Sequence, residues 1–126
     1  MFVTLRWTFR AAACLTLLGL AACGATASPT PRPNEVQVIE PVGKEAQWTY
    51  APQELRVAAG TTVTFVNKGK EFHTITSDDE GRPFDVGIDS GKSATLAFDK
   101  AGRFGYHCGV HPQMKAVVRV CDGACG

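Results

Sequence analysis

The chain has 126 residues and a formal net charge of +1, from 13 basic and 12 acidic side chains. This balance disfavours a nucleic-acid partner, because nucleic-acid-binding domains carry an excess of basic residues on one face. The length suits one small domain with a single hydrophobic core rather than two domains.

The N-terminus has the pattern of an export signal. Two arginines, Arg6 and Arg10, precede an apolar run from Ala11 to Ala22. A basic segment followed by a short apolar run is typical of a secretory signal, and this run is too short to cross a bilayer comfortably as a permanent helix. We therefore expect an exported protein.

The apolar run ends in Leu20-Ala21-Ala22-Cys23, which resembles the bacterial lipoprotein box. The resemblance implies that Cys23 is lipidated and anchors the protein to the bacterial cell membrane, on its periplasmic or extracytoplasmic face. Cleavage after Ala25 or Ala27 is the alternative, and it would release a soluble protein. Because several acyl chains on one cysteine hold a protein firmly, lipidation decides between a tethered and a free domain.

Three regions follow from this interpretation. Residues 1–22 form the signal peptide, residues 23–34 the lipidated cysteine and a proline-rich tether, and residues 35–126 the folded domain with a cysteine-containing tail. The tether has nothing apolar to bury, and its prolines favour an extended, semi-rigid spacer.

Short β-prone segments separated by turn signals run through the folded domain. Between Thr61 and Asn67, Val63 and Phe65 alternate with threonines, as a half-buried strand requires. We predict an all-β Greek-key sandwich of about eight strands in two packed antiparallel sheets. The expected strands are Val36 to Glu40, Gln47 to Tyr50, Glu54 to Val57, Thr61 to Asn67, His73 to Ser77, Ser93 to Phe98, Arg103 to Cys108 and Lys115 to Val120.

The connection between the last two expected strands contains the chemically informative residues. Cys108, His111 and Met114 follow one another there in the pattern C-x-x-H-x-x-M. Thiolate, imidazole and thioether form a soft ligand set that suits copper, in which a trigonal Cys-His-His arrangement takes a weak axial methionine. This set lacks one imidazole.

His73 is the candidate for the missing ligand. His107 directly precedes Cys108 in an expected strand, where adjacent side chains point to opposite faces, so it should point away from an ion held by Cys108. His73 is the one histidine left, and it begins an expected strand after a turn. We therefore predict one copper ion per chain, bound by His73, Cys108, His111 and Met114.

Other metal sites fit this loop less well. A binuclear copper centre needs two cysteines in the loop, and only Cys108 is present. Structural zinc prefers four strong nitrogen or sulfur ligands and seldom takes a thioether. A mononuclear copper site is the prediction that remains.

Residues 47–120 resemble a cupredoxin, a type 1 blue copper protein, of the group that includes plastocyanin and pseudoazurin. The ligand loop is most similar to that of amicyanin, through its short spacing and through Tyr106-His107-Cys108. The upstream stretch Pro52 to Asn67, which includes Ala59 to Phe65, matches the strand pair expected before the first histidine ligand. The resemblance implies a cupredoxin-like fold.

One departure from the cupredoxin pattern concerns Thr74. Many relatives have an asparagine after the first histidine ligand, and its side chain helps to tie the ligand loops together. Here Thr74 stands at that position. Its hydroxyl, or another group, must make that contact.

The resemblance implies an electron carrier and not an enzyme. Four protein ligands leave no open strong coordination position for a substrate. By the same resemblance His111 is the electron port, in a docking patch with Val110 and Pro112. We expect a monomer that docks transiently with a redox protein donor and acceptor.

Cys121 and Cys125 remain after the metal and lipid sites are assigned. The Asp122-Gly123 turn between them would bring the two thiols together, so we expect a local disulfide. A second copper-binding or thiol-exchange site, free thiols and intermolecular bonds are the alternatives. With the tether, these cysteines also motivate a different function, that of an envelope copper chaperone, storage or sensing module.

Overall fold

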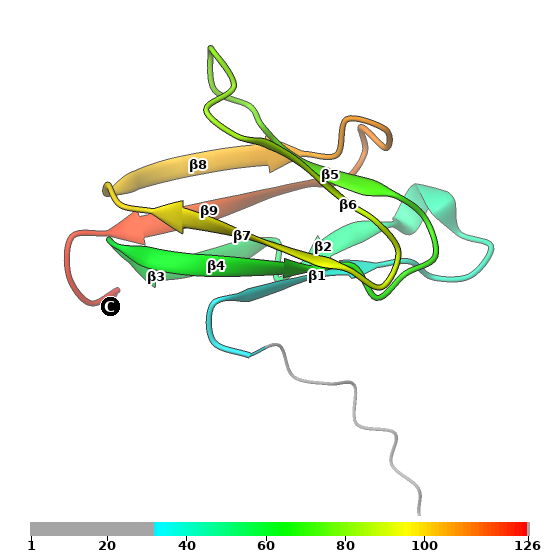
Figure 1. Cartoon of the computed structure of the whole chain (residues 1–126), viewed down its shortest axis with the longest axis horizontal. Helices are drawn as coiled ribbons and strands as arrows, with labels where there is room; N and C mark the ends of the chain where they lie inside the picture. Colours follow the sequence, from blue (N-terminus) through cyan, green and yellow to red (C-terminus); the bar gives the residue numbers. More distant parts are fainter. Residues whose placement is uncertain (1–31, 126) are drawn as a thin grey trace, which may run out of the picture.

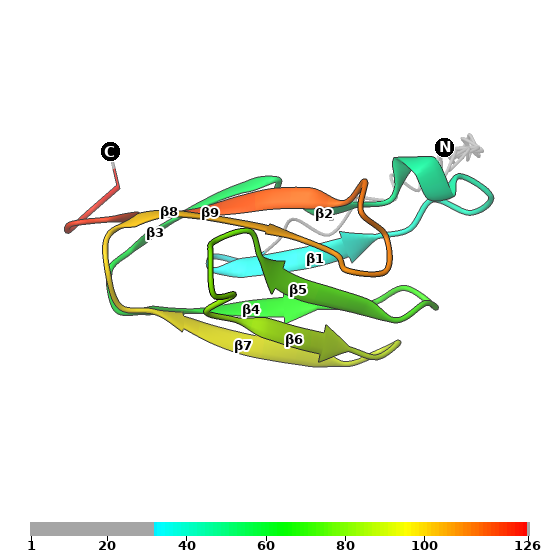
Figure 2. The same ribbon diagram turned by 90° about the horizontal axis from the view of Figure 1, so that it is seen from above.

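The computed structural model describes residues 32–125, so the predicted signal peptide, Cys23 and most of the tether lie outside the described residues. Within this range nine strands form two sheets that pack face to face (Figures 1 and 2). A short 3-10 helix, η1 (Glu45–Gln47), lies between the first two strands. No helix in the described part of the chain is long and apolar enough to cross a membrane.

The two sheets divide the strands unequally. One sheet has four strands in the order β2-β1-β4-β7, and the other has five in the order β3-β9-β8-β5-β6. The bounds are β1 (Glu35–Ile39), β2 (Thr49–Ala51), β3 (Glu54–Ala58), β4 (Thr61–Val66), β5 (His73–Ser77), β6 (Asp85–Ile88), β7 (Ser93–Phe98), β8 (Gly102–His107) and β9 (Lys115–Cys121).

The predicted all-β sandwich is confirmed, with two differences. The sequence prediction misses β6, a four-residue edge strand that contains Gly87 and therefore lacks an alternating pattern. Gly87 leaves room for the ring of Phe72, which a Cβ at this position would meet at 2.8 Å. The sheets are also mixed, because β1 pairs with β4 and β3 with β9 in parallel. Alternation along a strand reports which face is buried and not the direction of its neighbour.

The hydrophobic core fills the space between the sheets, and three of its buried aromatic rings, those of Tyr50, Phe65 and Tyr106, pack as a cluster. The ring centroid of Tyr106 lies 5.5 Å from that of Phe65 and 5.0 Å from that of Tyr50. Each such burial contributes about 1.5–3 kcal/mol. Burial raises the pKa of Tyr50, so its phenol stays neutral and donates a 2.6 Å hydrogen bond to the Thr74 carbonyl. The core is thereby joined to β5 beside His73.

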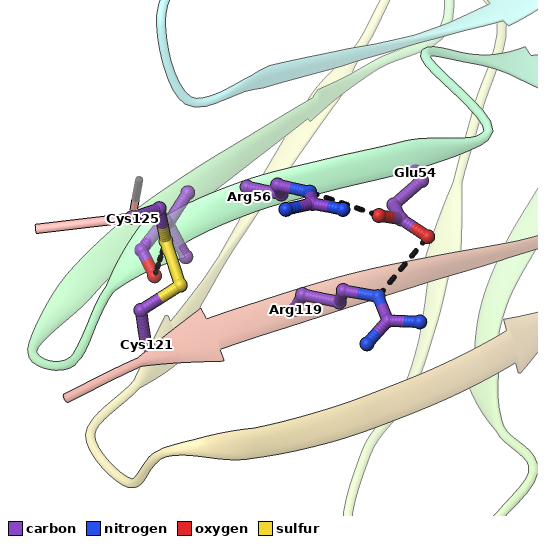
Figure 3. Close-up of a disulfide and its surroundings, with 6 residues drawn as sticks. Glu54, Arg56, Arg119, Cys121 and Cys125 are labelled. Atoms are coloured by element: carbon purple, nitrogen blue, oxygen red, sulfur yellow. Dashed lines mark hydrogen bonds and ion pairs between the residues drawn. A yellow bond between two sulfur atoms is a disulfide. The ribbon is translucent and has the colours of Figure 1, made fainter.

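The C-terminal tail folds back onto the edge of the five-stranded sheet. Cys121, the last residue of β9, forms a disulfide with Cys125, and their Cα atoms are 5.5 Å apart (Figure 3). The sulfur of Cys125 lies 3.2 Å from the Val57 carbonyl oxygen of β3. The disulfide therefore holds the tail against the strand that pairs with β9.

An ion-pair group bridges the same two strands on the exposed face. The Glu54 carboxylate accepts hydrogen bonds from Arg119 at 3.1 Å and Arg56 at 3.0 Å (Figure 3). The pKa of Glu54 lies below its usual value, mainly because of the hydrogen bond from Arg119 and to a smaller extent because of the one from Arg56. Because these side chains are solvent-exposed, the group contributes little to stability.

Candidate metal centre

The connection between β8 and β9 contains three of the predicted ligands. The two strands pair as far as His107 and Lys115, so residues 108–114 form a tight loop at this end of the sandwich. The Cys108 N–H donates to the Met114 carbonyl at 3.1 Å, and the Met114 N–H donates to the His111 carbonyl at 2.9 Å. These bonds close the loop and leave Cys108 and Met114 fully buried.

His73 reaches this loop as the first residue of β5. The turn before it depends on the buried side chain of Asn67, which donates to the carbonyls of Glu71 at 2.7 Å and Ile88 at 3.0 Å. These two bonds attach the turn to the end of β6. His73 is itself fully buried, so its ring has a fixed place at the end of the sandwich.

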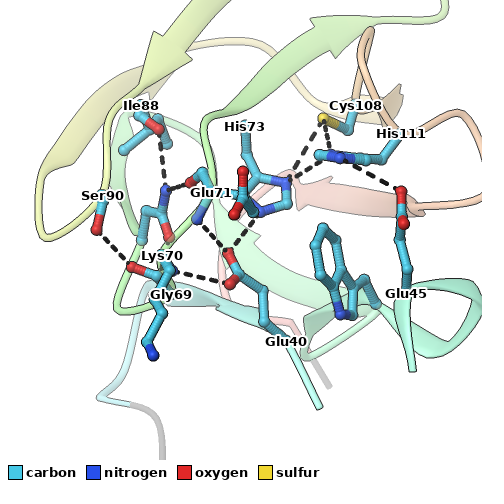
Figure 4. A network of polar contacts seen from close by, with 12 residues as sticks. Glu40, Glu45, Gly69, Lys70, Glu71, His73, Ile88, Ser90, Cys108 and His111 are labelled. Atoms are coloured by element: carbon cyan, nitrogen blue, oxygen red, sulfur yellow. Dashed lines mark hydrogen bonds and ion pairs between the residues drawn. The ribbon is translucent and has the colours of Figure 1, made fainter. Parts of the chain in front are cut away.

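Three donor atoms meet between β5 and the loop. The Cys108 Sγ lies 3.7 Å from the Nδ1 of His73 and 3.7 Å from the Nδ1 of His111 (Figure 4). The two Nδ1 atoms are 3.3 Å apart. Within residues 32–125 this is the one cluster of three or more histidine, cysteine or acidic side chains whose geometry could hold a metal ion.

The dimensions of this triangle fit a metal ion at its centre. Three donors spaced evenly around an ion, at about 2.0 Å for nitrogen and about 2.3 Å for sulfur, stand roughly 3.5–3.8 Å apart. The observed separations are 3.3 and 3.7 Å. With the buried thioether of Met114 in the same loop, the donor set is two imidazoles, one thiolate and one thioether. That set is the one expected of a type 1 copper ion.

Comparison with known proteins assigns the fold to a family. Residues 12–120 match the family described as Cupredoxin-like domain. The chain is a cupredoxin. A chloroplastic plastocyanin from Tetradesmus obliquus is 32% identical over 72 residues, which are 49% of this chain and 50% of the plastocyanin. This cupredoxin thus spans about half the length of that curated relative.

Solved structures share the fold. A purple cupredoxin from Nitrosopumilus maritimus superposes with a TM-score of 0.60 and 27% identity, over 69% of this chain and 98% of the other. The Cu(I) form of an amicyanin variant gives a TM-score of 0.56 and 26% identity, over 69% and 80%. A Cu-containing nitrite reductase from Thermus scotoductus gives 0.57 and 26%, but only 24% of that larger chain is covered. The predicted cupredoxin-like fold is therefore confirmed, and the site fits one type 1 copper ion.

Thr74 supplies the contact that an asparagine makes in many cupredoxins. The Gly109 N–H, directly after Cys108, donates to Thr74 Oγ1 at 2.8 Å. The Thr74 hydroxyl contacts that of Thr76 at 2.8 Å, and Thr76 donates to Asp85 at 2.8 Å. Because the Thr76 hydroxyl donates its hydrogen to Asp85, the Thr74 hydroxyl is the donor in the bond between the two threonines. This ordered chain ties the ligand loop to β5 and β6.

The thiolate of Cys108 also has a backbone partner. The Thr74 N–H donates to Cys108 Sγ at 3.3 Å. The thiolate is the form of cysteine that binds metals, and this N–H helps to fix the place of the sulfur. Thr74 therefore contacts both Cys108 and the residue after it.

The remaining histidine lies outside the cluster. His107 is at the end of β8, and its Nδ1 is 2.6 Å from an oxygen of Asp78. Its side chain is 27% exposed, whereas His73 is fully buried. Strand alternation turns His107 to the opposite face from Cys108, as the sequence indicates.

The predicted docking patch lies around His111. The side chain of His111 is 15% exposed, Val110 is 52% exposed, and Pro112 is also exposed. Phe72, from the turn before β5, is 44% exposed. The site therefore has one histidine that meets solvent and one that does not.

Sequence reasoning missed Glu40, which directly follows β1. One carboxylate oxygen lies 2.7 Å from His73 Nε2, and the carboxylate accepts the backbone N–H groups of Lys70 at 2.8 Å and Glu71 at 3.3 Å (Figure 4). Burial opposes ionisation of Glu40, but these hydrogen bonds outweigh it and hold the pKa of the carboxyl below its usual value. No signal in the sequence distinguishes Glu40 from a surface glutamate.

The segment around η1 was missed as well. The Trp48 ring contacts His111 edge-on, with centroids 5.0 Å apart, and its Nε1 donates to the Pro41 carbonyl at 3.2 Å. Gln113 donates to the Glu45 carbonyl at 3.2 Å, so the segment is also attached to the ligand loop. These contacts place the connection between β1 and β2 against one side of His111.

We predict that Thr74→Val loosens the ligand loop, because valine has no oxygen to accept the Gly109 N–H. One lost hydrogen bond of this kind costs about 0.5–1.5 kcal/mol, so amide exchange at Gly109 should accelerate about twofold to tenfold. Hydrogen exchange followed by NMR measures this. Thr74→Ser keeps the hydroxyl and should retain the slow exchange. Equal exchange rates at Gly109 in both variants would contradict the role given to Thr74.

Proposed function

We propose that this cupredoxin holds one copper ion through His73, Cys108, His111 and Met114 and carries single electrons between redox proteins. The observation that supports this most is the triangle of His73 Nδ1, His111 Nδ1 and Cys108 Sγ, with edges of 3.3 and 3.7 Å. Bound copper supplies a one-electron change between its cuprous and cupric states.

The protein contributes a rigid, water-excluding frame. His73, Cys108 and Met114 are all fully buried, and the loop is held by its own backbone bonds and by Thr74. Four protein donors in such a frame leave no strong position for a substrate. This supports an electron carrier and disfavours an enzyme.

We propose that electrons pass through His111. It is the ligand candidate that meets solvent, and Val110 and Pro112 beside it form an exposed apolar patch. A small apolar patch suits weak, transient docking of a redox partner by a monomeric carrier. A Cys121–Cys125 disulfide disfavours the copper chaperone or storage alternative, because both sulfurs are then unavailable as a second soft site.

We predict that the copper-loaded protein is intensely blue and that Cys108→Ser loses the colour, because the colour arises from charge transfer between thiolate and cupric ion. Visible absorption of protein reconstituted with one equivalent of copper measures this. The double variant Cys121→Ser, Cys125→Ser removes two other sulfurs and should stay blue. A wild-type protein that binds copper without colour would refute the proposal.

We predict that Val110→Glu slows electron exchange between Cu(I) and Cu(II) copies of the protein, since two like charges would face each other in the encounter. Like-charge juxtaposition costs several kcal/mol, so a reduction of about tenfold or more is expected. NMR line broadening in mixtures of the two redox states gives the rate. Ala101→Glu introduces the same charge at the opposite end of the sandwich, where β7 and β8 are joined (Figure 1). Equal slowing by both variants would exclude docking through the Val110 patch.

We propose that the domain is exported and tethered through lipidated Cys23, with residues 24–34 as spacer. The Cys121–Cys125 disulfide supports an extracytoplasmic location, since disulfides persist in oxidising compartments. The Leu-Ala-Ala-Cys pattern supports the lipid.

We predict that Cys23→Ser releases the protein from the membrane, because the acylated residue is lost. Cell fractionation and labelling with a radioactive fatty acid measure this in a bacterial host. Cys14→Ser, within the signal, should leave both the label and the membrane fraction unchanged. Fatty-acid label that persists in Cys23→Ser would rule out this anchor.

A further inference from the structure

Glu40 lies on the far side of the His73 ring from Cys108 (Figure 4). Its side chain is 9% exposed, and it is 2.7 Å from the Nε2 of a histidine that is 0% exposed. Two backbone N–H groups, from Lys70 and Glu71, also point at the carboxylate. Glu40 is therefore a largely shielded carboxylate with three N–H partners around it.

The contact determines which nitrogen of His73 is free. Both carboxylate oxygens of Glu40 accept a backbone N–H, Oε2 from Lys70 and Oε1 from Glu71. The group therefore acts as an acceptor, and His73 Nε2 is the donor to it. A neutral imidazole with its proton on Nε2 presents its lone pair at Nδ1. That atom is the one that lies 3.7 Å from Cys108 Sγ and 3.3 Å from His111 Nδ1.

Gly69 is a second sign that the chain makes room for this carboxylate. A Cβ at Gly69 would overlap the carboxylate group of Glu40. Gly69 does not adopt the left-handed backbone region that favours glycine, so its φ does not disfavour an alanine there. The absence of a side chain at this position serves the Glu40 contact.

His73 and His111 differ in how closely a carboxylate approaches the Nε2 atom and in how exposed that carboxylate is. The Nε2 of His111 also has a carboxylate near it, that of Glu45, but at 3.8 Å and with a side chain that is 67% exposed. Solvent screens such a pair, and it contributes little. A buried carboxylate at 2.7 Å is screened much less.

We propose that Glu40 is a positioning residue for the copper site, which holds His73 in the Nδ1-ligating tautomer and lowers the reduction potential of the bound copper. This inference rests on the proposed function. A hydrogen-bonded carboxylate makes its histidine a more basic ligand, and a buried negative charge stabilises the more highly charged cupric state. The proton on Nε2 stays in place in both redox states, and the couple transfers one electron and no proton.

The test compares Glu40→Gln with Glu45→Gln in the copper-loaded full chain. Glutamine keeps the size of the side chain and removes the charge, so Glu40→Gln should raise the reduction potential. We expect the ratio of Cu(I) to Cu(II) at a fixed ambient potential to increase about tenfold, which is 59 mV for a one-electron couple. Glu45→Gln should change this ratio less than twofold, because its charge is screened. Redox titration followed by visible absorption gives both values.

Gly69→Ala provides an independent variant, since it displaces the Glu40 carboxylate and leaves both Glu40 and His73 in the sequence. We expect it to raise the Cu(I) to Cu(II) ratio in the same direction as Glu40→Gln. In wild-type Cu(I) protein labelled with ¹⁵N-histidine, NMR should show a His73 Nε2 proton that exchanges slowly with water. This measurement needs no variant and stands even if one of them fails to fold.

Two results would overturn the inference. The first is that Glu40→Gln and Glu45→Gln change the Cu(I) to Cu(II) ratio by the same factor. The second is that the Nε2 of His73 carries no slowly exchanging proton. Either result leaves the proposed function standing, provided that the wild-type protein is blue and reversibly reduced. A colourless wild-type copper protein would instead refute the proposed function itself.

Discussion

The structure depends on one constraint, which is that three potential metal-donor atoms lie close together at a site shielded from solvent. Two imidazole nitrogens and one sulfur lie within 3.7 Å of one another at positions that are largely shielded from water. Polar groups buried in this way cost free energy unless they are bonded, and their lone pairs repel each other. The fold must therefore hold them together against that cost, and a bound cation removes it.

The frame holds the donors from two directions. Cys108, His111 and Met114 are local to one loop, closed by the β8–β9 pairing and by backbone bonds within it. His73 comes from β5, which is paired with β8 through Thr76 and His107. The Thr74 hydroxyl joins the two parts at Gly109. Since every one of these contacts belongs to the protein alone, the site is preformed and a change in the charge of a bound ion need not reshape it.

The sequence predicted the parts of this design that are local or periodic. Alternation in Thr61–Val66 identified a strand, and the C-x-x-H-x-x-M spacing identified the ligand loop. His73 followed because strand alternation turns His107 away. The need for a contact from Thr74 was also visible, because its position lacked the asparagine of related chains.

The features that could not be predicted are a short strand without a pattern and contacts between residues that lie far apart in the sequence. β6 is short and interrupted by Gly87, so no pattern marks it. The parallel pairs β1–β4 and β3–β9 join segments whose sequences carry no information about direction. Glu40 is 33 residues from His73, and its burial comes from the turn that folds over it. The identity of a residue as glutamate does not indicate whether its carboxylate is shielded or exposed.

The connection from Glu40 to Trp48 affects both histidines of the site. At its start Glu40 contacts the buried Nε2 of His73, and at its end Trp48 packs edge-on against the more exposed ring of His111. The first contact affects the charge around a bound ion, and the second affects how much of His111 meets solvent. The hydrogen bond from Trp48 to the Pro41 carbonyl, directly after Glu40, links the two ends of this connection. We therefore expect changes that displace the backbone of this connection, unlike a change confined to the exposed Glu45 side chain, to alter reduction potential and partner docking together. Changes in the ligand loop would instead first alter the binding of the ion.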